Sequence, residues 1–125
     1  MKPRILIVED MEDSLELFRH VLQMAGYDIL ACGDGLTAVT LAVSERPDLV
    51  LMDISLPGID GHEATRRILA QTVDRPIPII AVTAHAMPVD RERALEAGCI
   101  AYLAKPVSPR VLTQVVAQLL AAATP

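Results

Sequence analysis

Five short apolar runs recur along the chain, and segments with helical spacing separate them. The runs are Ile5 to Val8, Asp28 to Ala31, Leu49 to Met52, Ile77 to Val82 and Ile100 to Leu103. The first, third and fourth runs are continuously hydrophobic, which is typical of parallel strands covered by helices on both faces. The alternation predicts five successive strand-helix units within the 125 residues of the chain.

Helix-capping residues indicate where the intervening helices begin and end. The predicted helices run from about Leu15 to Ala25, from Leu36 to Glu45, from Asp60 onward, from Val89 to Ala97 and from Ser108 onward. Gly26 and Gly98 are suited to the left-handed backbone that ends a helix. Asp60, with Glu63 three residues later, has the pattern of a capping box, and Ser108-Pro109 combines a hydroxyl cap with a proline in the first turn.

The order of these elements predicts a doubly wound α/β fold with helices on both faces of the sheet. Right-handed crossovers in a (βα)5 chain favour five parallel strands in the order 2-1-3-4-5. In such sheets, ligands bind at the carboxyl ends of the strands, where the strand order reverses. We therefore expect a functional site near the ends of the first and third strands.

Most of the apolar runs end in residues with a charge or a hydroxyl. Glu9 and Asp10 follow the first run, Asp53 the third, Thr83 the fourth and Lys105 the fifth. Because the carboxyl ends of parallel strands share one edge of the sheet, these side chains are expected in one shallow pocket.

The predicted pocket has the composition of a magnesium and phosphoryl site. Three carboxylates repel one another unless a cation neutralises them, and an incomplete set of oxygen ligands suits Mg²⁺. Lys105 could pair with Asp53 or with an incoming phosphoryl group, and Thr83 could donate to a phosphoryl oxygen. Asp53 is then a candidate nucleophile that forms an aspartyl phosphate.

Each of these residues also has a simpler interpretation when taken alone. Glu9 and Asp10 could be acids that cap the following helix, and Lys105 could be a solvated surface lysine. Thr83 or Asp53 alone could be an ordinary hydrogen-bonding residue at a strand end. Their joint occurrence at the carboxyl ends of the expected strands favours a common site.

Four segments, ILIVED, DLVLMDISLPGIDG, IIAVTAHAM and AYLAKPV, resemble the receiver domain of two-component response regulators. The resemblance covers nearly the whole chain and implies a flavodoxin-like fold. It implies that Asp53 accepts a phosphoryl group from a phosphohistidine on a sensor histidine kinase or a histidine phosphotransfer protein. It also implies that Asp10 and Asp53 bind Mg²⁺ together with the backbone carbonyl of Ser55, while Glu9 acts chiefly through metal-bound water.

The same resemblance implies a two-state switch. Thr83 and Lys105 would contact the phosphoryl oxygens, Thr83 would move toward them, and Tyr102 would turn inward to fill the space. The face formed by the fourth helix, the fifth strand and the fifth helix would then change its contacts with a downstream effector protein. The Lys105-Pro106 bond is expected to be cis, as is usual in the family.

Two further positions are expected to tune the lifetime of the phosphoryl group, namely Ser55 and His85, although His85 could also be a plain loop residue. The segment around His85 is similar to receivers of hybrid kinases and phosphorelays. Pro88 and Val89 depart from that pattern, because a polar residue and a glycine often stand there.

Three alternative functions compete with this interpretation. The segment from Gly33 to Ala38 matches a relaxed dinucleotide-binding fingerprint, but it follows the second strand, and the chain is too short for a second nucleotide-binding half. A phosphatase of the haloacid dehalogenase type would need an acid two residues after Asp53, where Ser55 stands. A degenerate receiver that binds partners without phosphorylation is the third alternative. We therefore expect a phosphoryl acceptor rather than an enzyme.

Charge, hydropathy and cysteine content limit which macromolecules the protein could bind and where in the cell it is expected. The net charge of -5 argues against direct binding to nucleic acid. The chain has neither a signal peptide pattern nor an apolar run long enough to span a membrane, so no membrane contact is expected. Cys32 and Cys99 lack any metal-binding spacing and are expected to be buried free thiols of a cytoplasmic protein. Residues 1–125 are expected to form one receiver domain without an output domain.

Overall fold

The computed structural model describes residues 2–84 and 87–123, and it contains the predicted parallel sheet. The strands are β1 (Arg4–Val8), β2 (Asp28–Cys32), β3 (Leu49–Asp53), β4 (Ile79–Thr83) and β5 (Ala101–Ala104). All neighbouring strands pair in parallel, in the order β2-β1-β3-β4-β5. The predicted doubly wound, flavodoxin-like α/β fold is therefore confirmed.

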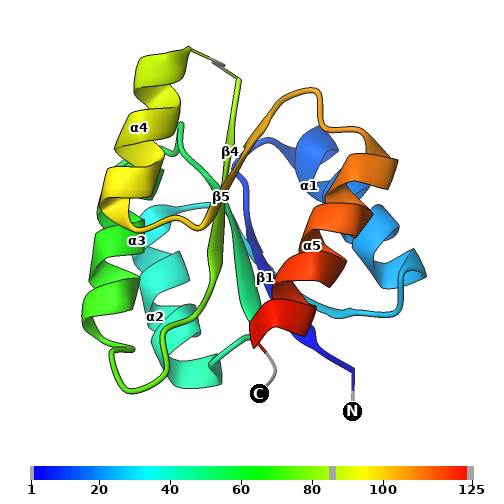
Figure 1. Cartoon of the computed structure of the whole chain (residues 1–125), viewed down its shortest axis with the longest axis horizontal. Coiled ribbons are helices and arrows are strands. Elements are labelled where there is room, and N and C mark those ends of the chain that lie inside the picture. Colours follow the sequence, from blue (N-terminus) through cyan, green and yellow to red (C-terminus); the bar gives the residue numbers. More distant parts are fainter. Residues whose placement is uncertain (1, 85–86, 124–125) are drawn as a thin grey trace.

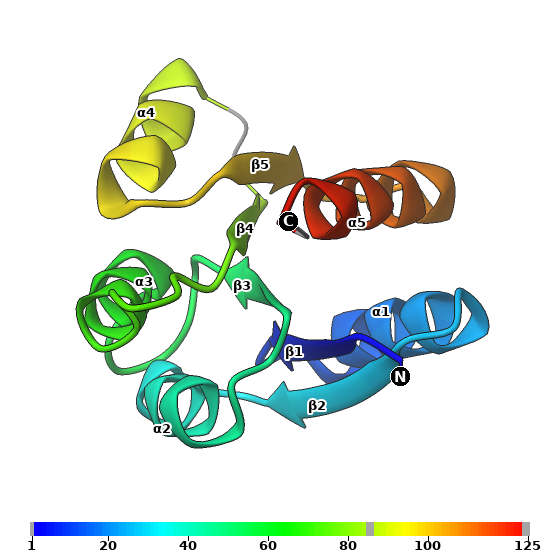
Figure 2. The ribbon, with the colours of Figure 1, turned by 60° about the horizontal axis from the view of Figure 1, so that its bottom comes forward.

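Five helices alternate with the strands and cover both faces of the sheet (Figures 1 and 2). They are α1 (Glu12–Met24), α2 (Gly35–Glu45), α3 (Gly61–Ala70), α4 (Pro88–Ala97) and α5 (Pro109–Ala123). Helices α1 and α5 lie on one face, and α2, α3 and α4 lie on the other. None of the helices in the described part of the chain is long and apolar enough to cross a membrane.

The core has two halves because successive residues of a strand point to opposite faces of the sheet. In β1, Ile5 and Ile7 belong to the half of the core on the side of α1 and α5, whereas Leu6 and Val8 belong to the half on the side of α2, α3 and α4. Every residue of β3 and β4 is buried, because these strands are covered on both sides. The continuous apolar runs of the sequence thus correspond to strands that are buried on both faces.

Most of the predicted helix ends are present in the structure. Asp60 caps α3 by accepting a hydrogen bond of 2.9 Å from the backbone N–H of Glu63, and Asp34 caps α2 in the same way. The Ser108 hydroxyl accepts from a backbone N–H in the first turn of α5, 3.3 Å away. Gly98 ends α4 with a φ of 112°. These local contacts determine where α2, α3 and α5 begin and where α4 ends.

Two strands begin later than predicted, and the other differences are single residues at strand ends. Strand β4 begins at Ile79 rather than Ile77, because Pro78 has no N–H to contribute to the ladder and only its carbonyl oxygen pairs, with the Val50 N–H. Strand β5 begins one residue later than predicted, at Ala101. Neither shift moves the polar residues at the carboxyl ends of the strands.

Candidate functional site

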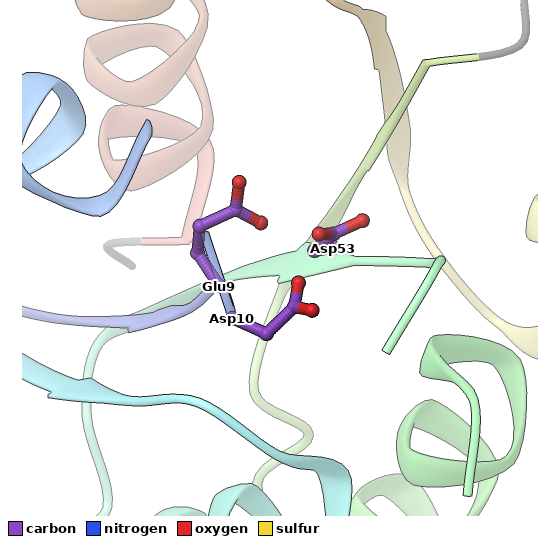
Figure 3. A group of neighbouring side chains, drawn as sticks. All are labelled: Glu9, Asp10 and Asp53. Atoms are coloured by element: carbon purple, nitrogen blue, oxygen red, sulfur yellow. The ribbon is translucent and has the colours of Figure 1, made fainter. Parts of the chain in front are cut away.

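Three carboxylates meet at the carboxyl edge of the sheet, between β1 and β3. Val8 pairs with Met52 in adjacent strands, so the residues that follow them emerge side by side. Glu9, Asp10 and Asp53 each offer one oxygen, and these oxygens all lie within 4.8 Å of one another (Figure 3). Glu9 is 2% exposed and Asp53 is 4% exposed, whereas Asp10 is open to solvent. The predicted acidic cluster is therefore present, with one side facing water.

The Lys105 ammonium lies against these carboxylates. Its Nζ atom is 2.6 Å from Glu9 Oε1 and 3.6 Å from Asp53 Oδ2. The backbone N–H of Lys105 donates to the Thr83 carbonyl oxygen over 2.7 Å, which aligns the end of β5 with that of β4. The Lys105-Pro106 peptide bond is cis, as predicted.

One ammonium does not balance three carboxylates, and the pKa values reflect this. Burial, together with the neighbouring Asp53 carboxylate, raises the pKa of Glu9 to about 7, although Lys105 opposes the shift. Burial alone would lower the pKa of Lys105, but hydrogen bonding and attraction to Glu9 and Asp53 outweigh it and raise that pKa. The lysine stays charged, and the pocket retains unneutralised negative charge.

The donor set of this pocket fits a small divalent cation. Glu9 Oε2 is buried, and no hydrogen-bond donor in the described part of the chain reaches it. A buried carboxylate oxygen without a partner is costly, and carboxylate oxygens are the ligands that Mg²⁺ prefers. Glu9, Asp10 and Asp53 can therefore supply an incomplete oxygen shell whose remaining positions are filled by water.

The Asp53 side chain is held from its own loop. The Ser55 backbone N–H donates to Asp53 Oδ1 over 2.9 Å, and the Ile54 N–H donates to the Val82 carbonyl oxygen over 3.0 Å. These two bonds fix the carboxylate and the backbone that carries it. They leave Oδ2 on the side of Lys105.

Thr83 and Tyr102 lie together beside the pocket. Thr83 is buried at the end of β4, and Tyr102 is half-buried in the adjacent strand β5. Burial and the charge of Asp90 raise the pKa of Tyr102, while a side-chain hydrogen bond with Thr83 opposes the shift. The two predicted switch residues are therefore in direct contact.

The structure also decides between the simpler interpretations. Helix α1 begins after Met11 without a side-chain cap, so Glu9 and Asp10 are not capping acids. Lys105 is partly buried in an ion pair rather than free in solvent. The segment from Gly33 to Ala38 follows the edge strand β2, and its Asp34 serves to cap α2. His85 lies outside the described residues.

Gly61 is the last residue of the segment DLVLMDISLPGIDG, and in the structure it lies against the acceptor strand. A Cβ atom on Gly61 would be 2.7 Å from Ile54 Cα and closer still to the Asp53 carbonyl oxygen. The sequence alone assigns it no role, although a glycine directly after the capping residue Asp60 occupies a helical position where alanine is a better helix former.

Comparisons with known proteins agree with this geometry. Residues 5–117 match the family described as the response regulator receiver domain. The polar-differentiation response regulator DivK of Brucella anthropi is 45% identical over 113 residues, which cover 90% of this chain and 92% of that protein.

Solved structures agree as well. The receiver domain of the sensor histidine kinase PA1611 from Pseudomonas aeruginosa, described with a magnesium ion coordinated in its active-site cleft, has a TM-score of 0.90 and 40% identity, covering 97% of this chain and 99% of that one. The chemotaxis response regulator CheY4 of Vibrio cholerae has a TM-score of 0.89 and 25% identity, covering 95% and 99%. The chain therefore belongs to the response regulator receiver family, and it is a phosphoryl acceptor rather than a conventional enzyme.

Proposed function

We propose that Asp53 accepts a phosphoryl group from a phosphohistidine, with Mg²⁺ bound beside it, and that the modified domain signals through its protein contacts. The observation that carries this proposal is the gathering of Glu9, Asp10 and Asp53 around one point, next to the Lys105 ammonium. The mutual repulsion of these carboxylates destabilises a folded protein unless a bound cation neutralises it. Such clusters are therefore typical of functional sites.

Asp10 and Asp53 would hold the metal together with the backbone carbonyl of Ser55, and Glu9 would act chiefly through metal-bound water. The magnesium in the cleft of the 40% identical Pseudomonas receiver supports the choice of ion. When bound, Mg²⁺ neutralises charge on the carboxylates and on the phosphoryl oxygens, so that two anions can approach.

The transfer is a displacement at phosphorus. An oxygen of the Asp53 carboxylate forms a bond to phosphorus while the P–N bond of the donor phosphohistidine breaks. The donor imidazole leaves with the electron pair and takes up a proton from solvent. Lys105, already 3.6 Å from Asp53 Oδ2, and the Thr83 hydroxyl then contact the phosphoryl oxygens.

The donor is proposed to be a sensor histidine kinase or a histidine phosphotransfer protein. A hollow of about 310 Å³ opens beside Lys105, the lysine that contacts Asp53, and its walls are largely apolar. It is lined by Ser14, Leu17, Phe18, Lys105, Pro106 and Val107. An apolar recess next to a charged acceptor suits a protein donor better than a small molecule, because it offers area for docking.

The output is proposed to be a change at the face of α4, β5 and α5. Thr83 moves toward the phosphoryl group, its hydrogen bond with Tyr102 is lost, and Tyr102 turns inward. The chain spans 92% of a DivK protein, which supports signalling to an effector by the receiver alone. The two free cysteines fit a cytoplasmic location.

Intact-protein mass spectrometry after incubation with acetyl phosphate, with and without Mg²⁺, tests this function. We expect one phosphoryl adduct on the wild-type protein, dependent on Mg²⁺ and absent from Asp53→Asn. Asp13→Asn, which removes an exposed acid from the first turn of α1, is the matched control and should retain the adduct. An unmodified wild-type protein, beside a receiver that accepts this donor, would indicate a binding module that works without phosphorylation.

A further inference from the structure

Gly61 is the first residue of α3, and its Cα atom lies against the backbone of the acceptor residue. A Cβ atom at this position would be 2.7 Å from Ile54 Cα and 3.0 Å from Ile54 Cδ1, with the Asp53 carbonyl oxygen nearer than either. Real Cβ atoms essentially never approach another heavy atom within 3.0 Å. Two of these neighbours are backbone atoms, one at the end of β3 and one in the next residue, so they cannot move aside as a flexible side chain can.

The backbone at Asp53 and Ile54 is held from two sides. On the side of the sheet, the Ile54 N–H donates to the Val82 carbonyl oxygen of β4 over 3.0 Å. On the side of the helix, the Gly61 N–H donates to the Ile54 carbonyl oxygen over 3.1 Å. The two peptide groups on either side of the Ile54 Cα atom are thus held, one by β4 and the other by the first turn of α3.

This clamp reaches the reactive carboxylate through one further bond. The Ser55 N–H donates to Asp53 Oδ1 over 2.9 Å, so the loop that α3 holds also orients the Asp53 side chain. A rotation of the peptide between Asp53 and Ile54 would move both the carboxylate and the N–H that fixes it. The gap to Lys105 Nζ, 3.6 Å from Asp53 Oδ2, would change with it.

We propose that Gly61 is a positioning residue for phosphoryl transfer, because its missing side chain lets α3 press on the Asp53 backbone and hold the carboxylate in its reactive orientation. This inference rests on the proposed function of Asp53. A side chain at Gly61 forces one of two changes. Either α3 retreats and loses its bond to Ile54, or the Asp53 peptide rotates.

The effect on transfer is expected to exceed the effect on folding. A displacement of a reacting group by about 1 Å costs roughly 100-fold in rate, since the geometry of attack is lost. A packing defect elsewhere on the same helix lowers stability without that loss. The two effects are therefore separable by comparing the two ends of α3.

Gly98→Ala provides the matched control. A Cβ atom on Gly98 would strike the Leu69 side chain near the far end of α3, and the φ of 112° at Gly98 adds backbone strain. Gly61→Ala and Gly98→Ala thus both disturb α3, but only the first does so next to Asp53. Both variants are expected to melt at a lower temperature than the wild type.

The experiment measures the rate of phosphoryl uptake from acetyl phosphate over a range of donor concentrations, together with Mg²⁺ affinity by titration calorimetry. We expect Gly61→Ala to lower the maximal rate roughly 10- to 100-fold, with weaker Mg²⁺ binding and an unchanged donor KM. Gly98→Ala should transfer at the wild-type rate wherever it is folded. Wild-type transfer by Gly61→Ala, or an equal loss in both variants, would overturn the proposal.

If Gly61→Ala does not fold, a milder pair of variants tests whether the start of α3 positions Asp53. Asp60→Ala removes the cap of α3 and loosens its first turn, and Asp34→Ala removes the equivalent cap of α2. We expect a several-fold slower transfer only in Asp60→Ala, and equal rates in the pair would overturn the proposal. If the wild-type protein takes up no phosphoryl group, the proposed function fails instead, and Mg²⁺ affinity alone decides whether Gly61 positions Asp53.

Discussion

Glu9 is the residue at which function and stability conflict most directly. It is almost fully buried, one of its oxygens has no donor in the described part of the chain, and Lys105 compensates only part of the charge around it. Functional sites often retain such arrangements at the expense of folding free energy. The Glu9 carboxylate thus contributes to binding of the cation and not to the stability of the metal-free protein.

Glu9→Gln should therefore stabilise the protein while weakening its metal site. Removing the charge relieves the repulsion with Asp53, and we expect the free energy of unfolding at neutral pH to rise by about 1 kcal/mol. Mg²⁺ affinity should fall in the same variant, as measured by calorimetry. Asp10→Asn, at an exposed ligand position, should weaken Mg²⁺ binding without stabilising the fold; equal stabilisation by both variants would show that burial of Glu9 is not the cause.

Arg46, which is not part of the acidic pocket, is a second residue in an unfavourable state, because its backbone is left-handed. It ends α2 with a φ of 47°, and its guanidinium pairs with Asp74 at 2.9 Å on the surface. Left-handed backbone costs a non-glycine residue about 1–2 kcal/mol, whereas an exposed ion pair contributes about 0–1 kcal/mol. Thermal or denaturant unfolding should show Arg46→Gly to be about 1 kcal/mol more stable than Arg46→Ala, and equal stability would mean that the backbone is relaxed.

Among the elements, the contact of α3 with α4 contains a buried histidine. His62 is 5% exposed, and no partner within the described residues reaches its Nδ1 atom. Burial lowers the pKa of His62 below its ordinary value of 6.5. The charged groups that act on it are Asp60, which caps α3, Arg66 within α3, and Asp90 and Arg93 of α4.

This histidine predicts a loss of stability in mild acid. The folded protein binds the proton less readily than the unfolded chain, so the stabilising contribution is complete above pH 6.5 and is lost as the pH falls below 6.5. His62→Leu should flatten this part of the curve of unfolding free energy against pH. The same substitution at exposed His20 of α1 is the control, and a slope that survives His62→Leu would assign the effect to another group.

The elements and most of the site could be predicted from local sequence. Continuous apolar runs identified β3 and β4, and Asp60 with Glu63 identified the start of α3. The position of Asp53 after a buried strand was enough to place it, because parallel strands end at a common edge. The contact of Tyr102 with Thr83 fits the register of β4 with β5, because Tyr102 pairs with Ala81, which points to the same face of the sheet as Thr83.

What could not be predicted depends on distances between segments remote in sequence. Lys105 lies nearer to Glu9 than to Asp53, and this difference of side-chain geometry has no counterpart in the local sequence. The approach of Gly61 to the Asp53 backbone depends on how closely α3 lies against the end of β3. The burial of His62 likewise depends on α4, which no local pattern reports.

For the whole molecule, the metal site links ligand binding to folding. Glu9 and Asp10 follow β1 and Asp53 ends β3, so a cation bound by all three joins two adjacent strands of the central sheet. A ligand that binds only the folded state stabilises it by about 2.7 kcal/mol at one hundred times its dissociation constant. Mg²⁺ should therefore raise the melting temperature, and a chelator should reverse the change.

The control for this stabilisation by Mg²⁺ is a variant that lacks one of the metal-binding carboxylates. Asp10→Asn should melt at nearly the same temperature with and without Mg²⁺, because an exposed ligand is lost while the fold is kept. The comparison is made at constant ionic strength, with sodium replacing magnesium, so that screening of the net charge of -5 is matched. An equal rise in the variant would mean that Mg²⁺ acts elsewhere on the surface.

The central claim is that Asp53 carries the phosphoryl group, and chemical trapping tests it most directly. The protein is incubated with acetyl phosphate and Mg²⁺ and then treated with borohydride, which reduces an aspartyl phosphate to homoserine and releases phosphate. Tandem mass spectrometry of the peptides then locates the converted residue. Homoserine at position 53 alone is the predicted result. Homoserine at Asp10 or another aspartate, or hydroxynorvaline at Glu9 or another glutamate, with Asp53 unchanged, would contradict the account.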